Sequence, residues 1–78
     1  MKLIAEVPWE WALWEDDGRR VLAVEVGGVA AWTLSVELTA DERALLDAQG
    51  PSGLAALIKS IQSNHPAYMG RRVADPKA

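Results

Sequence analysis

The sequence of 78 residues predicts an α+β fold, in which a three-stranded antiparallel meander is followed by two C-terminal helices. Up to Leu38 the apolar residues recur mostly at every second position, which is the period of a strand with one buried face. Beyond that point they recur at helical spacing. At the junction, Thr39-Ala40-Asp41-Glu42 has the form of a capping box, which begins a helix. We therefore expect strand order 1-2-3, with both helices packed on one face of the sheet.

The first hairpin is predicted to turn at Asp17-Gly18, because both positions tolerate the positive φ of a two-residue turn. This turn places Glu15 opposite Arg20, which is a favourable pair of opposite charges. It also places Leu13 opposite Leu22 on one apolar face. Pattern and turn therefore agree on this hairpin.

Pro8 interrupts the apolar alternation that runs from Leu3 to Leu13, and it has no amide hydrogen to donate to a ladder. Its position favours either an edge strand or two short strands broken at the proline. The three-stranded meander follows from the first alternative. In that arrangement Trp9 lies on the face toward the helices.

The second hairpin contains a pair of glycines and needs a loop with an odd number of residues. A two-residue turn would turn Trp32 and Leu34 away from the core, because a slip of one residue flips every side chain. A bulged turn over Gly27-Gly28-Val29 restores the parity. Leu22 then meets Leu34, and Val24 meets Trp32.

The two faces of the predicted sheet differ in polarity. The face toward the helices is apolar and comprises Trp9, Trp11, Leu13, Leu22, Val24, Val26, Trp32, Leu34 and Val36. The other face is mixed and mostly small, and comprises Glu10, Ala12, Trp14, Val21, Ala23, Glu25, Thr33 and Ser35. On this mixed face, the predicted register places Glu10 opposite Glu25, which is mildly repulsive unless a cation lies between them. Trp14 lies beside Val21 on this face. If exposed, it would form a small apolar patch, which is typical of an interaction surface; the alternative is plain surface packing.

The first helix is predicted over residues 40–49, where Gly50 is its natural C-terminal stop. Ser52 is predicted to cap a second helix over residues 53–63, whose apolar stripe packs on the sheet. Asn64 is expected to end this helix in a left-handed turn.

The chain is expected to form a single β-β-β-α-α domain over residues 1–74, with a short strand or ordered coil over 67–73 and a frayed tail over 75–78. The lack of cysteine excludes disulfides and thiolate metal sites. Its apolar runs are far shorter than the roughly 20 residues that span a bilayer. We therefore expect a cytoplasmic protein that does not bind membranes.

The net charge of −3 is unevenly distributed, since residues 1–47 carry −6 and residues 48–78 carry +3. An acidic sheet repels phosphate backbones, which argues against nucleic acid as a partner. The only histidine, His65, follows a helix and favours a structural role over that of a catalytic base. No motif for a metal or phosphate is complete. We therefore expect no enzymatic activity and no cofactor.

A partner interface is the remaining expectation. Arg71-Arg72 could contact a carboxylate or phosphate of a partner, although pairing with acids of the same chain is favoured. An unguarded edge of the strand at residues 31–38 could pair with a partner or a second copy. The candidate interface residues are Trp14, Val21, Glu10, Glu25, Arg71 and Arg72.

The C-terminal 45 residues resemble a pattern in small uncharacterised bacterial proteins, in which a strand runs into a Leu-Thr-capped helix and the chain closes on a basic segment. Some proteins of this kind are similar to immunity proteins of bacterial toxin systems in size and acidity. The resemblance is carried by Val36-Glu37-Leu38-Thr39-Ala40-Asp41-Glu42, Gly50, Leu54, Leu57-Ile58 and Arg71-Arg72-Val73.

These observations favour a non-enzymatic protein-interaction module, either immunity-like or regulatory. The alternative is a small-ligand-binding or enzyme-accessory domain, in which tryptophans form a platform for a sugar or an aromatic metabolite. A structural fragment that accompanies a larger protein is a third alternative.

Overall fold

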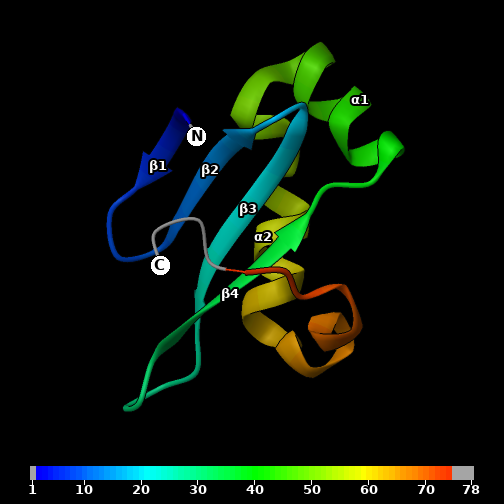
Figure 1. Ribbon diagram of the computed structural model, residues 1–78. Helices are drawn as coiled ribbons and strands as arrows, with labels where there is room; N and C mark the ends of the chain where they lie inside the picture. The colour runs from blue at the N-terminus through cyan, green and yellow to red at the C-terminus, as the bar shows by residue number, and fades with distance from the viewer. Residues whose placement is uncertain (1, 75–78) are drawn as a thin grey trace.

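A computed structural model describes residues 2–74, which form an antiparallel sheet followed by helices (Figure 1). The sheet has four strands in the order β1-β2-β3-β4. Its strands are β1 (Lys2–Val7), β2 (Trp11–Asp16), β3 (Arg19–Val26) and β4 (Trp32–Glu37). The helical elements are α1 (Ala40–Gln49), the 3₁₀ helix η1 (Gly50–Leu54), α2 (Ala55–Ser63) and the 3₁₀ helix η2 (His65–Arg71).

The predicted α+β class is confirmed, but the sheet has four strands where three were expected. The chain reverses at Pro8, so the second alternative for this segment, two short strands broken at the proline, is the one observed. Val7 O accepts a hydrogen bond from Glu10 N at 3.0 Å across this turn. Proline at the second position and a positive φ at Trp9 are typical of a type II turn. Trp9 therefore leaves the core side, and its predicted burial is wrong.

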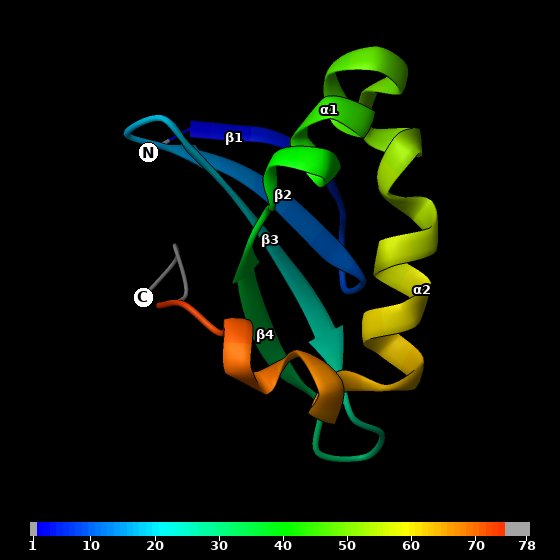
Figure 2. The ribbon, with the colours of Figure 1, turned by 90° about the vertical axis from the view of Figure 1, so that its right-hand side faces the viewer.

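The core lies between the sheet and the helices, and α2 runs along one face of the sheet (Figure 2). Strand alternation explains which side chains enter the core, since every second residue of the central strands points to the helices. Trp11, Trp32, Leu57 and Tyr68 pack against the edge of the core. Its buried members are Leu13, Leu22, Val24, Val26, Leu34, Val36, Leu38, Leu46, Leu54, Ile58 and Ile61.

The register of β2 with β3 is as predicted, with Glu15 opposite Arg20 and Leu13 opposite Leu22. The register of β3 with β4 has the predicted parity but is shifted by two residues. Leu22 meets Val36 rather than Leu34, because residues 27–31 form a longer loop than the expected three. This longer loop lets Val26 pair with Trp32 and extends the apolar ladder.

Helix α1 has the predicted bounds, and both hydrogen bonds of its capping box are present between Thr39 and Glu42. Two details of the second helix differ from expectation. Ser52 does not cap it; its hydroxyl donates at 3.0 Å to the carbonyl oxygen of Gln49, the last residue of α1. Asn64 ends it with φ −145°, which is not a left-handed conformation. Among residues 2–74, the helices are all too short or too polar to cross a membrane.

The segment that follows α2 closes one edge of the sheet. Residues 65–71 form η2, where a short strand or coil was expected, and Arg72 then makes a single bridge with Val36. Val73 N donates to Ser35 O at 2.8 Å. The edge of β4 that was expected to be free is therefore partly occupied. Residues 75–78, which were expected to fray, lie outside the described residues.

Candidate functional site

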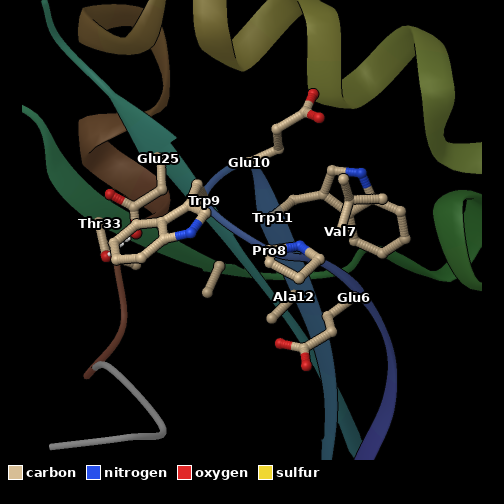
Figure 3. A pocket seen from close by; sticks show the side chains of 10 residues that line it. Glu6, Val7, Pro8, Trp9, Glu10, Trp11, Ala12, Glu25 and Thr33 are labelled. Carbon is tan, nitrogen blue, oxygen red and sulfur yellow. Dashed lines mark hydrogen bonds between the residues drawn. The ribbon is translucent and has the colours of Figure 1, made fainter.

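A pocket of about 300 Å³ opens beside the turn between β1 and β2 (Figure 3). Its central residues Ala12 and Ala23 face each other on neighbouring strands. They alternate with the core residues Leu13 and Leu22, so they belong to the face of the sheet that is turned away from the helices. We call this site the Trp9 pocket; it is lined by Glu6, Val7, Pro8, Trp9, Glu10, Trp11, Ala12, Ala23, Glu25 and Thr33.

Trp9 is the most unusual residue of the pocket. The residue is 93 % exposed, although a tryptophan gains more from burial than almost any other residue. Its φ of 68° places a bulky residue in the left-handed region, which costs about 1–2 kcal/mol outside glycine. The turn at Pro8 therefore keeps the indole outside the core, on a backbone conformation that is strained. Strain of this kind persists where the surroundings impose it, and such positions cluster at functional sites.

The pocket also carries three carboxylates. Glu25 N donates to Glu10 O at 2.8 Å, which extends the β2–β3 ladder and places these two residues opposite each other. The Thr33 hydroxyl donates to Glu25 Oε1 at 2.6 Å and fixes the orientation of that carboxylate. In Figure 3 the Glu6 carboxylate lies beside Ala12, whereas that of Glu10 points in the opposite direction. All three glutamates line the pocket, but the carboxylates of Glu6 and Glu10 point apart (Figure 3).

Four acids of the chain have a cationic partner, whereas the pocket carboxylates have none among residues 2–74. Within residues 2–74, the ion pairs involve Glu15, Asp16, Glu37 and Glu42, each with an arginine. Glu6, Glu10 and Glu25 take part in none of these pairs. The negative charge of the Trp9 pocket is thus uncompensated by the described residues.

The shortest of these ion pairs lies outside the pocket and connects the C-terminal segment to α1. Arg71 donates to both carboxylate oxygens of Glu42, at 2.6 and 3.1 Å, and to Glu37 O at 2.9 Å. Burial raises the pKa of Glu42, but hydrogen bonds from Arg71 and Thr39 and the charge of Arg71 lower it more, so that the net shift is downward. Tyr68 adds an aromatic ring 5.8 Å from the Arg71 guanidinium carbon.

The predicted interface residues do not form one surface. Glu10 and Glu25 lie opposite each other in backbone pairing, as the sequence predicted, and both line the Trp9 pocket. Arg71 binds Glu42 of the same chain. The guanidinium carbon of Arg72 lies 5.6 Å from the ring centre of Trp32, so both arginines have partners within the fold.

The exposed apolar patch proposed as one alternative for Trp14 is not observed. Val21 is only 2 % exposed, and its neighbours Ala12 and Ala23 are buried too. Trp14 is half-buried, and its indole N–H is buried with no hydrogen-bond partner among the described residues. Val21 cannot contact a partner in this conformation.

Sequence reasoning missed Trp9 and Glu6. Trp9 sits at an odd position in an alternating apolar run, so parity alone assigned it to the core. The signal that could have corrected this is Pro8, which is favoured at the second position of a type II turn and would place Trp9 at the third.

The carboxylates of the pocket do not form a metal site. Within residues 2–74, no three histidine, cysteine, aspartate or glutamate side chains gather closely enough to hold a metal ion. The pocket instead combines an exposed indole, dispersed acids and a floor of small residues. These features are suited to an organic ligand or to a side chain of another protein.

Comparison of the chain with protein-family models, with curated proteins and with solved structures gave no significant match. The functional hypothesis therefore depends on the geometry of the site.

Proposed function

We propose that this protein is a non-enzymatic protein-interaction module, which binds its partner at the Trp9 pocket and along the neighbouring edge of β1. The exposure of Trp9 is the observation that carries this proposal. Tryptophans are enriched among the residues that dominate binding energy at protein interfaces. An immunity-like protein, which covers a functional surface of another protein, is one form that this function can take.

The edge of β1 supports the same proposal. Among the described residues β1 pairs with β2 alone, so its outer backbone groups are open to an added strand. Leu3, Ile4 and Val7 are between 37 and 39 % exposed along this strand. Val7 also lines the Trp9 pocket, which makes the edge and the pocket one continuous surface. The β4 edge, by contrast, is bridged by Arg72.

Site-specific photo-crosslinking tests this proposal. A benzoylphenylalanine is placed at Trp9 in one variant and at Val29 in a control, because Val29 is fully exposed but lies outside the pocket. In cells that naturally express the protein, position 9 is expected to yield a discrete adduct with one protein, and position 29 none. The same adducts at both positions, or none at position 9, would contradict the proposal.

A second candidate function is the binding of a small ring-shaped ligand such as a sugar. The observation in its favour is that an exposed indole stands beside carboxylates, a combination that stacks on a sugar ring and bonds its hydroxyls. The expected platform of several tryptophans is reduced here to Trp9 and Trp11, the only two that line the pocket. A shift of tryptophan fluorescence on titration with a saccharide library would support this candidate.

A further inference from the structure

We propose that the Trp9 pocket receives the guanidinium group of an arginine side chain from the partner protein. This inference rests on the proposed function, since it names the chemistry of the partner that the module binds. The guanidinium would stack on the indole of Trp9 and bond the carboxylates of Glu25 and Glu6.

Charge complementarity is the first argument. Three glutamates line the pocket, no basic residue lines it, and none of the three is paired with a cation among residues 2–74. Thr33 occupies Glu25 Oε1, which leaves Glu25 Oε2 available to accept a bond from a ligand. A cationic guest would gain charge-assisted hydrogen bonds to these unpaired carboxylates.

Shape and chemistry favour arginine over a compact cation. The floor of Ala12 and Ala23 has only methyl groups, so space remains above it for a flat group. A planar guanidinium can stack on an indole while its N–H groups reach a carboxylate at the side. A metal ion fits less well, because the acids do not gather into a metal-binding cluster.

The same combination of an arginine, an aromatic ring and a carboxylate occurs elsewhere in the chain. Arg71 lies 5.8 Å from the ring centre of Tyr68 and is held by both oxygens of Glu42. The Trp9 pocket offers the same two components, an aromatic ring and a carboxylate, without the arginine. We infer that the partner supplies it.

The test is an NMR titration of the isotope-labelled protein with a blocked Gly-Ser-Arg-Ser-Gly peptide. Its control replaces the arginine with citrulline, which has nearly the same shape and no charge. The arginine peptide is expected to shift the Trp9 indole N–H and the amides of Ala12, Ala23 and Glu25, and to leave Val29 unchanged. Citrulline is expected to weaken binding at least about tenfold.

Variants locate the contacts. Trp9→Ala and Glu25→Gln are each expected to weaken the arginine peptide by about fivefold or more. The matched controls Val29→Ala and Glu15→Gln lie outside the pocket and are expected to change the affinity by less than about twofold. Because Glu25 also contacts Thr33, Glu6→Gln provides a second charge variant that does not disturb that bond.

The outcomes separate this inference from the proposed function. Equal binding of the arginine and citrulline peptides, shifts outside the pocket, or shifts by a saccharide and not by the peptide would each overturn it. If the crosslinker at position 9 captures a protein but the arginine peptide does not bind, the protein-interaction function is supported and the arginine proposal is wrong. If neither experiment succeeds, both proposals fail.

Discussion

The C-terminal segment and the Trp9 pocket both involve carboxylates and an aromatic ring, but among the described residues these groups have a cationic partner only at the C-terminal segment. At the C-terminal segment, Arg71 forms an ion pair with Glu42. The same carboxylate accepts a hydrogen bond at 2.9 Å from Thr39 N, at the N-cap of α1. In the pocket, Glu6, Glu10 and Glu25 lack a cation among the described residues, and Trp9 is exposed on a strained turn.

This difference indicates which region stabilises the fold and which is available for binding. Paired charges and aromatic contacts that lie within the fold contribute to the free energy of unfolding. Unpaired acids and an exposed indole on a strained turn lower the free energy of unfolding, as is common at functional sites. Substitutions in the two regions should therefore have effects of opposite sign on stability.

The largest effect is expected for Arg71→Ala. This substitution removes three hydrogen bonds and leaves the partly buried Glu42 carboxylate without its cation. We expect a loss of about 2 kcal/mol in the free energy of unfolding, measured by urea denaturation. The control is Arg19→Ala, whose more exposed pair with Asp16 should contribute less than about 1 kcal/mol. Equal losses in the two variants would contradict the assigned role of Arg71.

The pH dependence of stability provides an intermediate effect. Glu42→Gln keeps a residue that can complete the capping box but removes the charge that Arg71 binds. Because the pKa of Glu42 is lower in the folded state, its contribution is complete above the ordinary pKa of 4.5 and is lost as the pH falls through the lower folded value.

The stability difference between wild type and Glu42→Gln, about 1 kcal/mol, should therefore be constant at neutral pH and shrink in acid. Urea denaturation of both proteins at a series of pH values measures it. A difference that disappears between neutral and alkaline pH would show that another group is responsible.

The smallest effect is a gain in stability. Trp9→Gly should raise the free energy of unfolding by up to about 1 kcal/mol, because glycine adopts the positive φ of this turn without strain. Little packing is lost, since the indole is almost fully exposed. Trp9→Ala serves as the control, because alanine removes the same indole and keeps the strain. A thermal melt that shows Trp9→Gly to be less stable than Trp9→Ala would contradict this interpretation of the turn.

Much of the fold could be predicted from the sequence, because period and turn chemistry act locally. The alternation around Leu13 and Leu22 identified the buried face, and Asp17-Gly18 set the register of their strands. Thr39 identified the start of α1. Parity required an odd loop at Gly27 but could not set its length, since loops of three and five residues preserve the same faces.

The candidate site was predictable only in part. Glu10 and Glu25 were expected to lie opposite each other, and the pocket does contain both. Trp9 was misplaced because its position in an alternating run outweighed the turn preference of Pro8. The pairing of Arg71 with Glu42 joins residues 29 positions apart, so their partnership depends on tertiary structure that no local pattern encodes.

The most direct test of the proposed arginine site is ligand-induced stabilisation. The free energy of unfolding of wild type and of Glu25→Gln is measured with and without the arginine peptide, at about ten times its wild-type Kd. Wild type should gain about 1.4 kcal/mol, because a ligand that binds only the folded state stabilises it by RT ln(1 + [L]/Kd). Glu25→Gln should gain clearly less, whereas equal gains in both proteins, or no gain in wild type, would contradict the account.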